Sequence, residues 1–333
     1  MPLWLRTSGR AKALDIRRFL TTTLLGLFIT NLWAEPLAPP PLPNELAWVF
    51  TTNNPVKAVI ERPVECVNIP VEPMRRAQFI LGRLAFESPA LLGGQAARMG
   101  LSCASCHPSA RTNKHFFIKN ISGAAGTADV SENFFSSQGG NDYFAPVAIP
   151  DLADRANMQF LDRDTPKFRE KLLRLVTVEF DGQPPSTTTL DALQIYLQQV
   201  DQKHCDDKNK TIAKTWQQDW SRLFDAVELI ERAIEDENNK QLLFVVRMAR
   251  LRLQVLFDRY GIANSAQLNA ALIQSSRELQ KLTKPVNPKN PAGSSIKLLK
   301  WKAKNAVIME MLDDKQQQSA YNAVALSKYL NSH

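Results

Sequence analysis

The residues with the clearest chemical potential are Cys103 and Cys106, three positions apart, and His107, which follows directly. This C-x-x-C-H pattern is typical of c-type haem attachment. Two thiols one helical turn apart can add across two vinyl groups of a porphyrin, and the adjacent imidazole can bind the iron. A redox-active C-x-x-C pair or half of a zinc site shares part of the pattern. A redox-active pair is expected within a βαβ unit, and a zinc site needs a further pair of ligands; the sequence shows neither. We therefore predict one covalent haem c.

Four possibilities exist for the second axial ligand of the iron: Met158, His115, Met99 or no protein ligand. Met158 lies far enough beyond His107 for a loop to return over the ring, although a methionine that fills a gap in the core has the same signature. We predict Met158 as the distal ligand and His115 as the alternative, and we place Met99 on the proximal side. A Met/His pair suits electron transfer, whereas an open position would admit peroxide or a gas.

Basic residues flank the motif. Arg98 and Arg111 are the candidates for neutralising the haem propionates by charge-assisted hydrogen bonds. A solvated surface position is the alternative for either of them.

The sequence around the motif contains several further segments in a recognisable order. They are Gly82–His107 (GRLAFESPALLGGQAARMGLSCASCH), Asn120–Val130 (NISGAAGTADV), Phe134–Gly140 (FFSSQGG), Ala148–Leu152 (AIPDL) and Leu175–Val200 (LVTVEFDGQPPSTTTLDALQIYLQQV). Together they resemble the haem domain of the bacterial di-haem cytochrome c peroxidase and MauG-like family. The resemblance implies a cytochrome c-like fold whose last segment ends in a helix packed against the haem helix.

The chain departs from that family in one respect. Di-haem peroxidases carry two C-x-x-C-H motifs, and this chain has one. A two-haem mechanism within one polypeptide is therefore not available to it, which leaves open whether the chain is an enzyme.

Two further cysteines flank the family-like region, Cys66 just before it and Cys205 just after it. In an oxidising compartment a disulfide between them would join the two ends of the haem domain. Two free buried thiols are the alternative.

The first residues have the order of an export signal. Residues 1–18 are basic, residues 19–34 (FLTTTLLGLFITNLWA) are apolar, and a Pro-rich stretch follows. We predict a signal peptide over residues 1–34, cleaved near Ala34, and a periplasmic protein. An uncleaved anchor is the alternative. We predict that residues 35–65 are a Pro-rich linker that leads into the haem domain.

Composition excludes several classes of protein. Five basic residues and one acid fall within residues 1–34, which accounts for half of the net charge of +8 and removes most of the support for nucleic-acid binding. Neither G-x-G-x-x-G nor a P-loop occurs. Beyond residue 34 the sequence lacks the apolar run of about 20 residues that a polytopic membrane protein would need.

The pattern of residues 206–333 changes to long helical periodicity. Apolar stripes run over residues 212–234 and 242–260, with Gly261 as a C-terminal cap and Asn264 as the N-cap of a third helix. A loop follows at residues 285–293, and a last helical stretch runs from about residue 295 to 330, with a break near Asp313. The predicted fold class is therefore mainly α: a cytochrome c-like haem domain (residues 66–205) followed by an α-helical bundle (residues 206–333).

The bundle carries a run of lysines without an intervening acid. They are Lys281, Lys284, Lys289, Lys297, Lys300, Lys302 and Lys304. Such a run is commonly a solvated helix face, but it would also dock an acidic redox protein or a membrane surface. Oligomerisation through the bundle stays open as well.

These observations favour a periplasmic single-haem cytochrome that transfers single electrons between redox partners. One alternative is a peroxidase or oxidase whose second haem lies on a partner chain. The other is a haem-based sensor or assembly protein.

Overall fold

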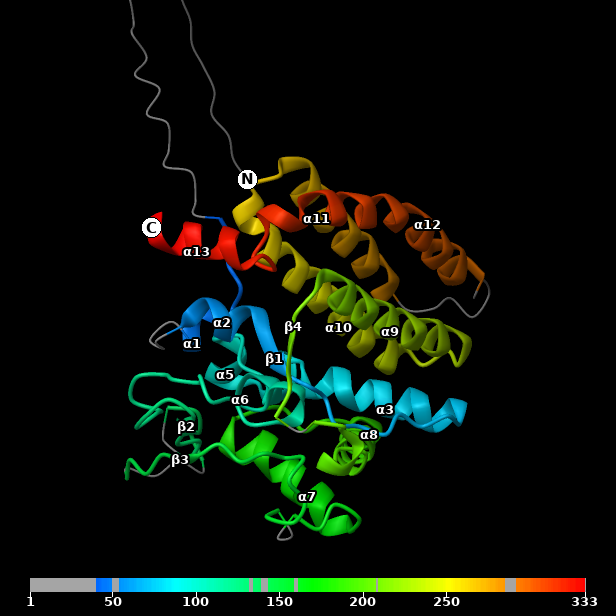
Figure 1. The fold of residues 1–333 in the computed structure, drawn as a ribbon. Helices are drawn as coiled ribbons and strands as arrows, with labels where there is room; N and C mark the ends of the chain where they lie inside the picture. Colours follow the sequence, from blue (N-terminus) through cyan, green and yellow to red (C-terminus); the bar gives the residue numbers. More distant parts are fainter. Residues whose placement is uncertain are drawn as a thin grey trace, which may run out of the picture. The chain divides into compact units, whose positions relative to one another are not determined.

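The computed structural model describes residues 40–49, 54–131, 134–138, 143–158, 161–207, 209–284 and 292–332, and residues 40–333 form one compact unit (Figure 1). The predicted signal peptide and Lys289 lie outside the described residues. Within the described residues, no helix combines the length and the apolar character that a membrane span requires.

The chain is mainly helical, as predicted from the sequence. The α-helices are α1 (Leu46–Val49), α2 (Pro55–Ile60), α3 (Pro73–Phe86), α4 (Pro89–Leu92), α5 (Gly94–Arg98), α6 (Cys103–Cys106), α7 (Pro166–Arg174), α8 (Thr187–Gln198), α9 (Trp216–Glu235), α10 (Asn239–Tyr260), α11 (Ala266–Gln280), α12 (Ala292–Lys315) and α13 (Ala323–Ser332). The short helical turns are η1 (Pro108–Ala110), η2 (Leu175–Glu179), η3 (Gln202–His204), η4 (Gly261–Ala263), η5 (Lys281–Thr283) and η6 (Gln316–Gln318). The strands are β1 (Glu61–Pro63), β2 (Thr127–Ala128), β3 (Val147–Ala148) and β4 (Thr211–Ala213).

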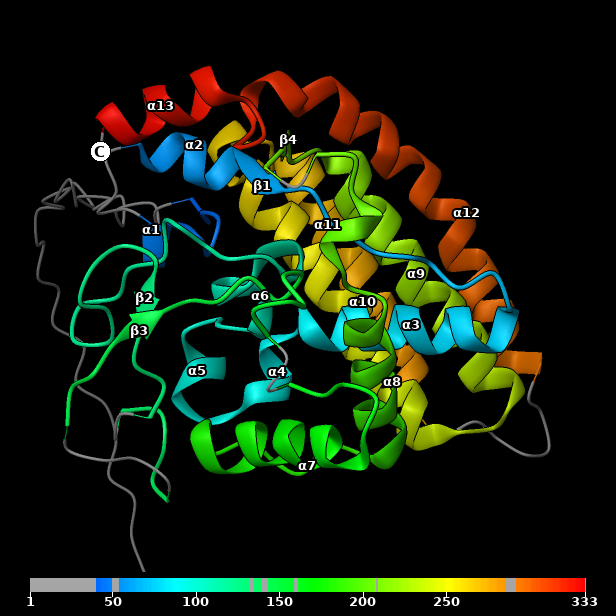
Figure 2. The ribbon, with the colours of Figure 1, turned by 60° about the horizontal axis from the view of Figure 1, so that its bottom comes forward.

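Helices α3 and α8 form the packed pair at the centre of residues 66–205, which we call the haem-motif region (Figure 2). Helix α3 begins at Pro73, and the Glu72 side chain accepts hydrogen bonds from the first backbone amides. The two helices approach most closely at Gly82, where a Cβ atom would lie 1.9 Å from the Ala192 carbonyl oxygen. The family resemblance implied that the closing helix packs on the haem helix, whereas the structure packs it on α3, which precedes the motif.

The two ends of this region are held together at three points. Strand β1 pairs antiparallel with β4, Val67 forms a bridge with Val200, and Cys66 and Cys205 form a disulfide. This is the cysteine pairing suggested by the sequence. It closes a loop with a sequence separation of 139 residues.

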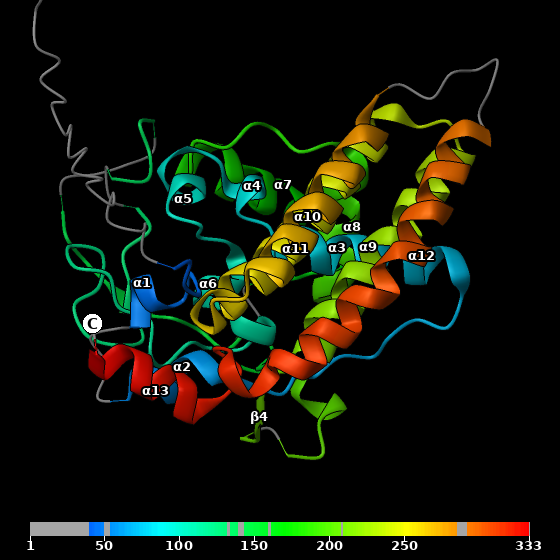
Figure 3. The ribbon, with the colours of Figure 1, turned by 90° about the horizontal axis from the view of Figure 1, so that it is seen from above.

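Helices α9 to α12 pack side by side as the predicted helical bundle (Figure 3). Helix α9 begins at Trp216 because the Thr215 side chain caps it and Gln218 completes a capping box. Ile212, which the sequence placed in the first helical stripe, lies instead in β4.

The ends of the bundle helices follow the sequence prediction in part. Gly261 is the C-cap of α10, as predicted, but its φ of −55° is not left-handed, and a Cβ atom there would lie 1.9 Å from the Pro41 carbonyl oxygen. The last helical stretch breaks just after Lys315, close to the predicted Asp313, and α13 then packs on α2. The N-cap of α11 differs, because Ser265 rather than Asn264 caps it and Asn264 takes a left-handed conformation.

The core is continuous across residue 205. One cluster of buried apolar residues includes Phe79 and Tyr196 from α3 and α8 together with Leu223, Val246 and Trp301 from the bundle. A second cluster surrounds the haem motif, and Cys103 packs against both clusters. The motif therefore lies where the two cores meet.

Candidate haem-attachment site

The two motif cysteines lie on the short helix α6. The Ser102 amide donates to Ser105 Oγ at 3.0 Å, which fixes the first turn. Cys103 and Cys106 lie one turn apart on the same side of this helix, and both thiols are free. Burial raises the pKa of each thiol to about 12. At neutral pH both side chains are therefore protonated thiols.

The surroundings of these thiols are apolar. Both cysteines pack against the second cluster, whose buried members include Leu101, Phe116 and Phe180. An apolar lining of this kind is what a porphyrin ring requires on either side of its attachment point.

His107 ends α6, and its imidazole is oriented by a backbone carbonyl. Its Nδ1 lies 3.1 Å from the Pro150 oxygen, which can only accept, so Nδ1 carries the proton. Burial lowers the pKa of His107 to about 4, against the opposing effects of this hydrogen bond and of Asp151, so the ring is neutral at pH 7. Nε2 then carries the lone pair, and among the described residues it has no hydrogen-bond partner. This is the tautomer that a metal-binding histidine needs.

The backbone that follows His107 takes an uncommon path. Ser109 and Ala110 both have φ 56°, the left-handed region that residues with a Cβ atom rarely adopt. The chain then returns to α6, because the Asn113 amide donates to the Cys106 oxygen at 3.0 Å and Asn113 Nδ2 donates to the Ser105 oxygen at 2.7 Å. The last carbonyl groups of α6 thus accept hydrogen bonds from the loop that follows the helix.

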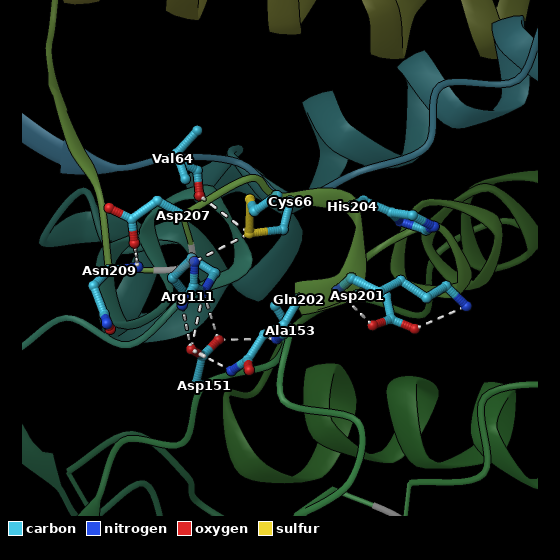
Figure 4. Close-up of a disulfide and its surroundings, with 12 residues drawn as sticks. Val64, Cys66, Arg111, Asp151, Ala153, Asp201, Gln202, His204, Asp207 and Asn209 are labelled. Carbon is cyan, nitrogen blue, oxygen red and sulfur yellow. Dashed lines mark hydrogen bonds and ion pairs between the residues drawn. A yellow bond between two sulfur atoms is a disulfide. The ribbon is translucent and has the colours of Figure 1, made fainter.

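Two side chains hold the segment that carries the Pro150 carbonyl, and Figure 4 shows the first of them, Arg111, beside Asp151. Arg111 Nε donates to Asp151 Oδ1 at 2.8 Å and Arg111 Nη2 donates to Asp151 Oδ2 at 2.7 Å. On the other side of the proline, Thr112 Oγ1 donates to the Ile149 oxygen at 2.6 Å. Arg111 and Thr112 therefore position Pro150, and through it the His107 ring.

The same arginine reaches the disulfide. Arg111 Nη1 lies 3.1 Å from Cys66 Sγ, and Arg111 is only 6% exposed. A buried Arg163 extends this framework by donating to the carbonyls of Leu152 and Leu197. Arg111 thus has a positioning role that sequence reasoning missed, and its predicted contact with a haem propionate stays a prediction.

The remaining predicted residues lie apart from this framework. Arg98 is exposed and donates to Gln95 Oε1 at 2.9 Å, so its predicted propionate contact also stays a prediction. Met158 is 6% exposed and lies in a turn in which its amide donates to the Arg155 oxygen. Met99 is half-buried and packs against the second cluster.

His115 lines a large cavity whose described lining includes none of Cys103, Cys106 and His107. Burial lowers the pKa of His115, and Lys57 and Lys114 lower it further. The structure thus places the alternative distal ligand in the wall of a cavity to which the motif contributes Ala104 and Ser105 but neither cysteine nor His107.

Sequence reasoning found the three motif residues and missed those that orient them. Pro150 and Asp151 belong to the segment Ala148–Leu152, which the family resemblance had singled out without assigning a role. A backbone carbonyl that accepts from a histidine 43 positions away has no side-chain signature, so only the fold shows it.

No cluster of three or more His, Cys, Asp or Glu side chains suited to a metal ion occurs among the residues with a described position. A second ligand pair that would make the motif half of a zinc site is therefore absent from that part of the chain. A c-type haem asks only for the two thiols and the imidazole that the motif supplies.

Comparison with known proteins returns no relative. The chain matches no protein-family model, no curated protein and no solved structure. The family resemblance of the motif region accordingly stays a prediction.

Proposed function

We propose that the chain is a single-haem c-type cytochrome that passes single electrons between periplasmic redox partners. The observation that carries this proposal is the state of His107: Nδ1 donates to the Pro150 oxygen, Nε2 has no partner among the described residues, and the two thiols of α6 are free beside it. A C-x-x-C-H motif needs these three groups in this state to hold a haem.

The roles of the chain's own residues follow from their geometry. Cys103 and Cys106 would anchor the ring through thioether bonds, and His107 would bind the iron through Nε2. The bound haem supplies an iron that takes up and releases one electron. The Pro150 carbonyl, fixed by Arg111 and Thr112, keeps the imidazole in one orientation and one tautomer. A rigid apolar surrounding suits electron transfer because little has to reorganise when the charge changes.

Met158 is our proposal for the distal ligand, and its burial at 6% exposure supports it. His115 is the weaker candidate, because it lines the separate cavity described above. A Met/His pair would close the iron to exogenous ligands and raise its potential.

The predicted compartment is supported by the disulfide between Cys66 and Cys205. Structural disulfides persist in oxidising compartments such as the bacterial periplasm. Together with the export signal predicted over residues 1–34, this supports a protein that folds and receives its haem outside the cytoplasm.

The experiment that tests the proposal is ligand challenge of the haem-loaded protein. We expect a low-spin ferric spectrum with a weak sulfur-to-iron charge-transfer band that does not respond to cyanide, carbon monoxide or peroxide. Met158→Ala should abolish that band, whereas Met99→Ala, a matched loss of a half-buried methionine, should keep it. A high-spin spectrum that shifts with cyanide or peroxide would contradict electron transfer and favour the peroxidase or oxidase alternative. A haem-dependent change in oligomeric state without electron exchange would favour the sensor alternative.

The described lysines between Lys281 in η5 and Lys304 in α12 are our proposal for the docking surface of an acidic redox partner. Lys302 and Lys304 are paired with Glu231 and Glu278, whereas Lys297 and Lys300 are exposed on α12. Exposed apolar side chains lie among them on the same helix: Ile296, Leu299 and Val307. An apolar patch within a basic rim is typical of transient docking surfaces.

A double variant, Lys297→Gln with Lys300→Gln, tests this surface. We expect it to slow electron exchange with the anionic reagent hexacyanoferrate and to flatten the dependence on ionic strength. Lys240→Gln with Lys328→Gln, which removes two exposed lysines elsewhere on α10 and α13, should leave both unchanged. Rates that ignore ionic strength and both double variants would exclude the docking surface. Binding of the protein to anionic vesicles would instead favour the membrane-surface alternative.

A further inference from the structure

A cavity of about 510 Å³ lies behind the haem-motif helix. Its walls come from α1, α2 and β1, from α6 and the loop that follows it, from the start of β4, and from α9 and α10. Ala104 and Ser105 line it, whereas Cys103 and Cys106 are absent from its described lining. Because successive helical residues are rotated by about 100°, Ala104 and Ser105 face away from the two cysteines. The cavity is thus distinct from the surface on which a haem would be attached, and its volume is typical of a site for a small molecule.

The cavity wall is strongly charged and has an excess of positive groups. Among the described residues, nine lysines and arginines line it, against six aspartates and glutamates. Most of the carboxylates are paired inside the wall: Glu45 lies 2.5 Å from Arg259 and 3.0 Å from Lys214, and Glu87 lies 3.1 Å from Arg252.

Three lining cations have no carboxylate within ion-pair distance among the described residues: Arg62, Lys114 and Lys210. Lys114 and Lys210 are exposed, so they lie where the wall meets solvent. Arg62 is half-buried on β1 and donates to Gln218 Oε1 at 3.3 Å.

Two carboxylates of the wall, Asp219 and Asp258, likewise have no cation within ion-pair distance among the described residues and accept instead from Tyr321 and Gln254. The excess of positive charge therefore comes from the nine cations of the wall taken together.

Several polar atoms of the wall are also without partners. Ser109 is only 9% exposed, and within the described part of the chain its Oγ has no hydrogen-bond partner. The Nε atoms of Arg62 and Arg252 are buried and likewise make no hydrogen bond to those residues. Because these atoms are closed off from the cavity as well as from solvent, a bound group would meet the charge of the wall and not these donors.

We propose that this cavity binds a small molecule that carries an oxyanion, a carboxylate or a phosphate group. Arg62, Lys114 and Lys210 supply the complementary charge. Guanidinium and ammonium groups around one cavity suit the several acceptor atoms of such a group. The proposal stands apart from the haem, because it uses none of the residues that would hold one.

Calorimetric titration of the full-length mature protein with inorganic phosphate and, separately, with malonate tests the proposal at constant ionic strength. We expect saturable binding of one equivalent of at least one probe, and at least tenfold weaker binding in Arg62→Gln. The double variant Lys114→Gln with Lys210→Gln changes only exposed side chains and should weaken binding as well, so the test does not depend on the folding of Arg62→Gln.

Lys328→Gln is the matched control, because it removes an exposed lysine of α13 that is not part of the described lining. It should bind both probes as the parent does. Saturation by phosphate alone or by malonate alone identifies the oxyanion class, and either result supports the site. Absence of saturable binding to both probes, or equal weakening in Lys328→Gln and in Arg62→Gln, would overturn it.

Discussion

Pro150 contributes to the candidate site through its carbonyl oxygen. The C-x-x-C-H motif alone therefore does not include every residue that the site needs. His107 needs a partner that fixes its tautomer, and Pro150 supplies it at 3.1 Å. Arg111 and Thr112, directly beyond the motif, then hold Pro150 in place through Asp151 and Ile149. The residues that orient the imidazole are therefore bound to the same loop that carries it.

At the same scale, Asp258 is a buried carboxyl group on α10 whose protonation is coupled to folding. Burial raises its pKa to about 6, the charge of Glu45 raises it further, and Gln254 and Arg259 oppose the rise. Because the folded-state pKa lies above the ordinary value, the folded protein binds more protons than the unfolded chain between about pH 4 and pH 6. The free energy of unfolding therefore falls as the pH rises through this window.

We expect Asp258→Asn to remove that fall. Relative to the parent, the variant should gain on the order of 2 kcal/mol in the free energy of unfolding when urea denaturation is compared at pH 4 and pH 7. Asp206→Asn, which changes an exposed aspartate, serves as the control and should follow the parent. A constant difference between Asp258→Asn and the parent at both pH values would contradict this assignment.

At the scale of elements, the crossing of α3 and α8 depends on Gly82. An alanine within a helix ordinarily stabilises it by up to about 1 kcal/mol relative to glycine. Here a Cβ atom would lie 1.9 Å from the Ala192 oxygen and 2.9 Å from the Tyr196 Cβ, so the helices would have to move apart. We expect Gly82→Ala to lower the free energy of unfolding by about 3 kcal/mol, the reverse of the propensity effect. Arg76→Ala, an exposed position on the same helix, should change it little. Stabilisation by Gly82→Ala in chemical denaturation would show that the helices do not cross there.

The disulfide acts at the same scale, because it joins the entry and exit of the haem-motif region. Cross-linking a loop of this separation stabilises the folded state by about 5 kcal/mol in the chain-entropy model. We expect the double variant Cys66→Ala with Cys205→Ala to lose stability of that order in urea denaturation. Alkylation of the denatured parent before and after reduction should show two additional modified thiols after reduction. An unchanged mass would rule the bridge out.

The elements also show how far sequence reasoning reaches. Helices α9 to α12 were predictable because their apolar stripes repeat every three or four residues. The N-cap of α11 was harder to predict, because Asn264 and Ser265 are adjacent and either residue type can cap a helix. In the structure Asn264 is left-handed and Ser265 is the N-cap. The packing of α13 on α2 joins residues from the two ends of the described chain, and no local pattern encodes that contact. At the site, the covalent motif is local and was readable, whereas the Pro150 carbonyl was not.

For the whole molecule, the haem-motif region and the bundle are joined by buried ion pairs as well as by a shared core. Arg83 Nη2 lies 2.7 Å from Asp225 Oδ2, and Arg252 Nη1 lies 3.1 Å from Glu87 Oε2. Arg222 on α9 pairs with Glu65 at 2.9 Å and also approaches Glu87 and Asp225. These contacts connect α3 and the segment before it to α9 and α10, so we expect both parts to unfold together.

Removing the central cation should reveal this coupling. Arg222→Gln would leave three carboxylates, Glu65, Glu87 and Asp225, to be compensated by Arg83 and Arg252 alone, and we expect a loss of about 3 kcal/mol in the free energy of unfolding. Arg169→Gln breaks an exposed pair with Asp191 instead and should cost less than about 1 kcal/mol. If both variants lost the same small amount, or if the unfolding of Arg222→Gln and of the parent split into two transitions, the ion pairs would not connect the two parts as described.

The most direct test of the central claim is the mass of the denatured protein after export in cells that attach haem c. The account predicts that one haem remains covalently bound after acid extraction, that Cys103→Ala with Cys106→Ala abolishes this attachment, and that Cys66→Ala with Cys205→Ala retains it. Complete extraction of the haem from the parent, or free and alkylatable thiols at Cys103 and Cys106 in the mature protein, would contradict the account.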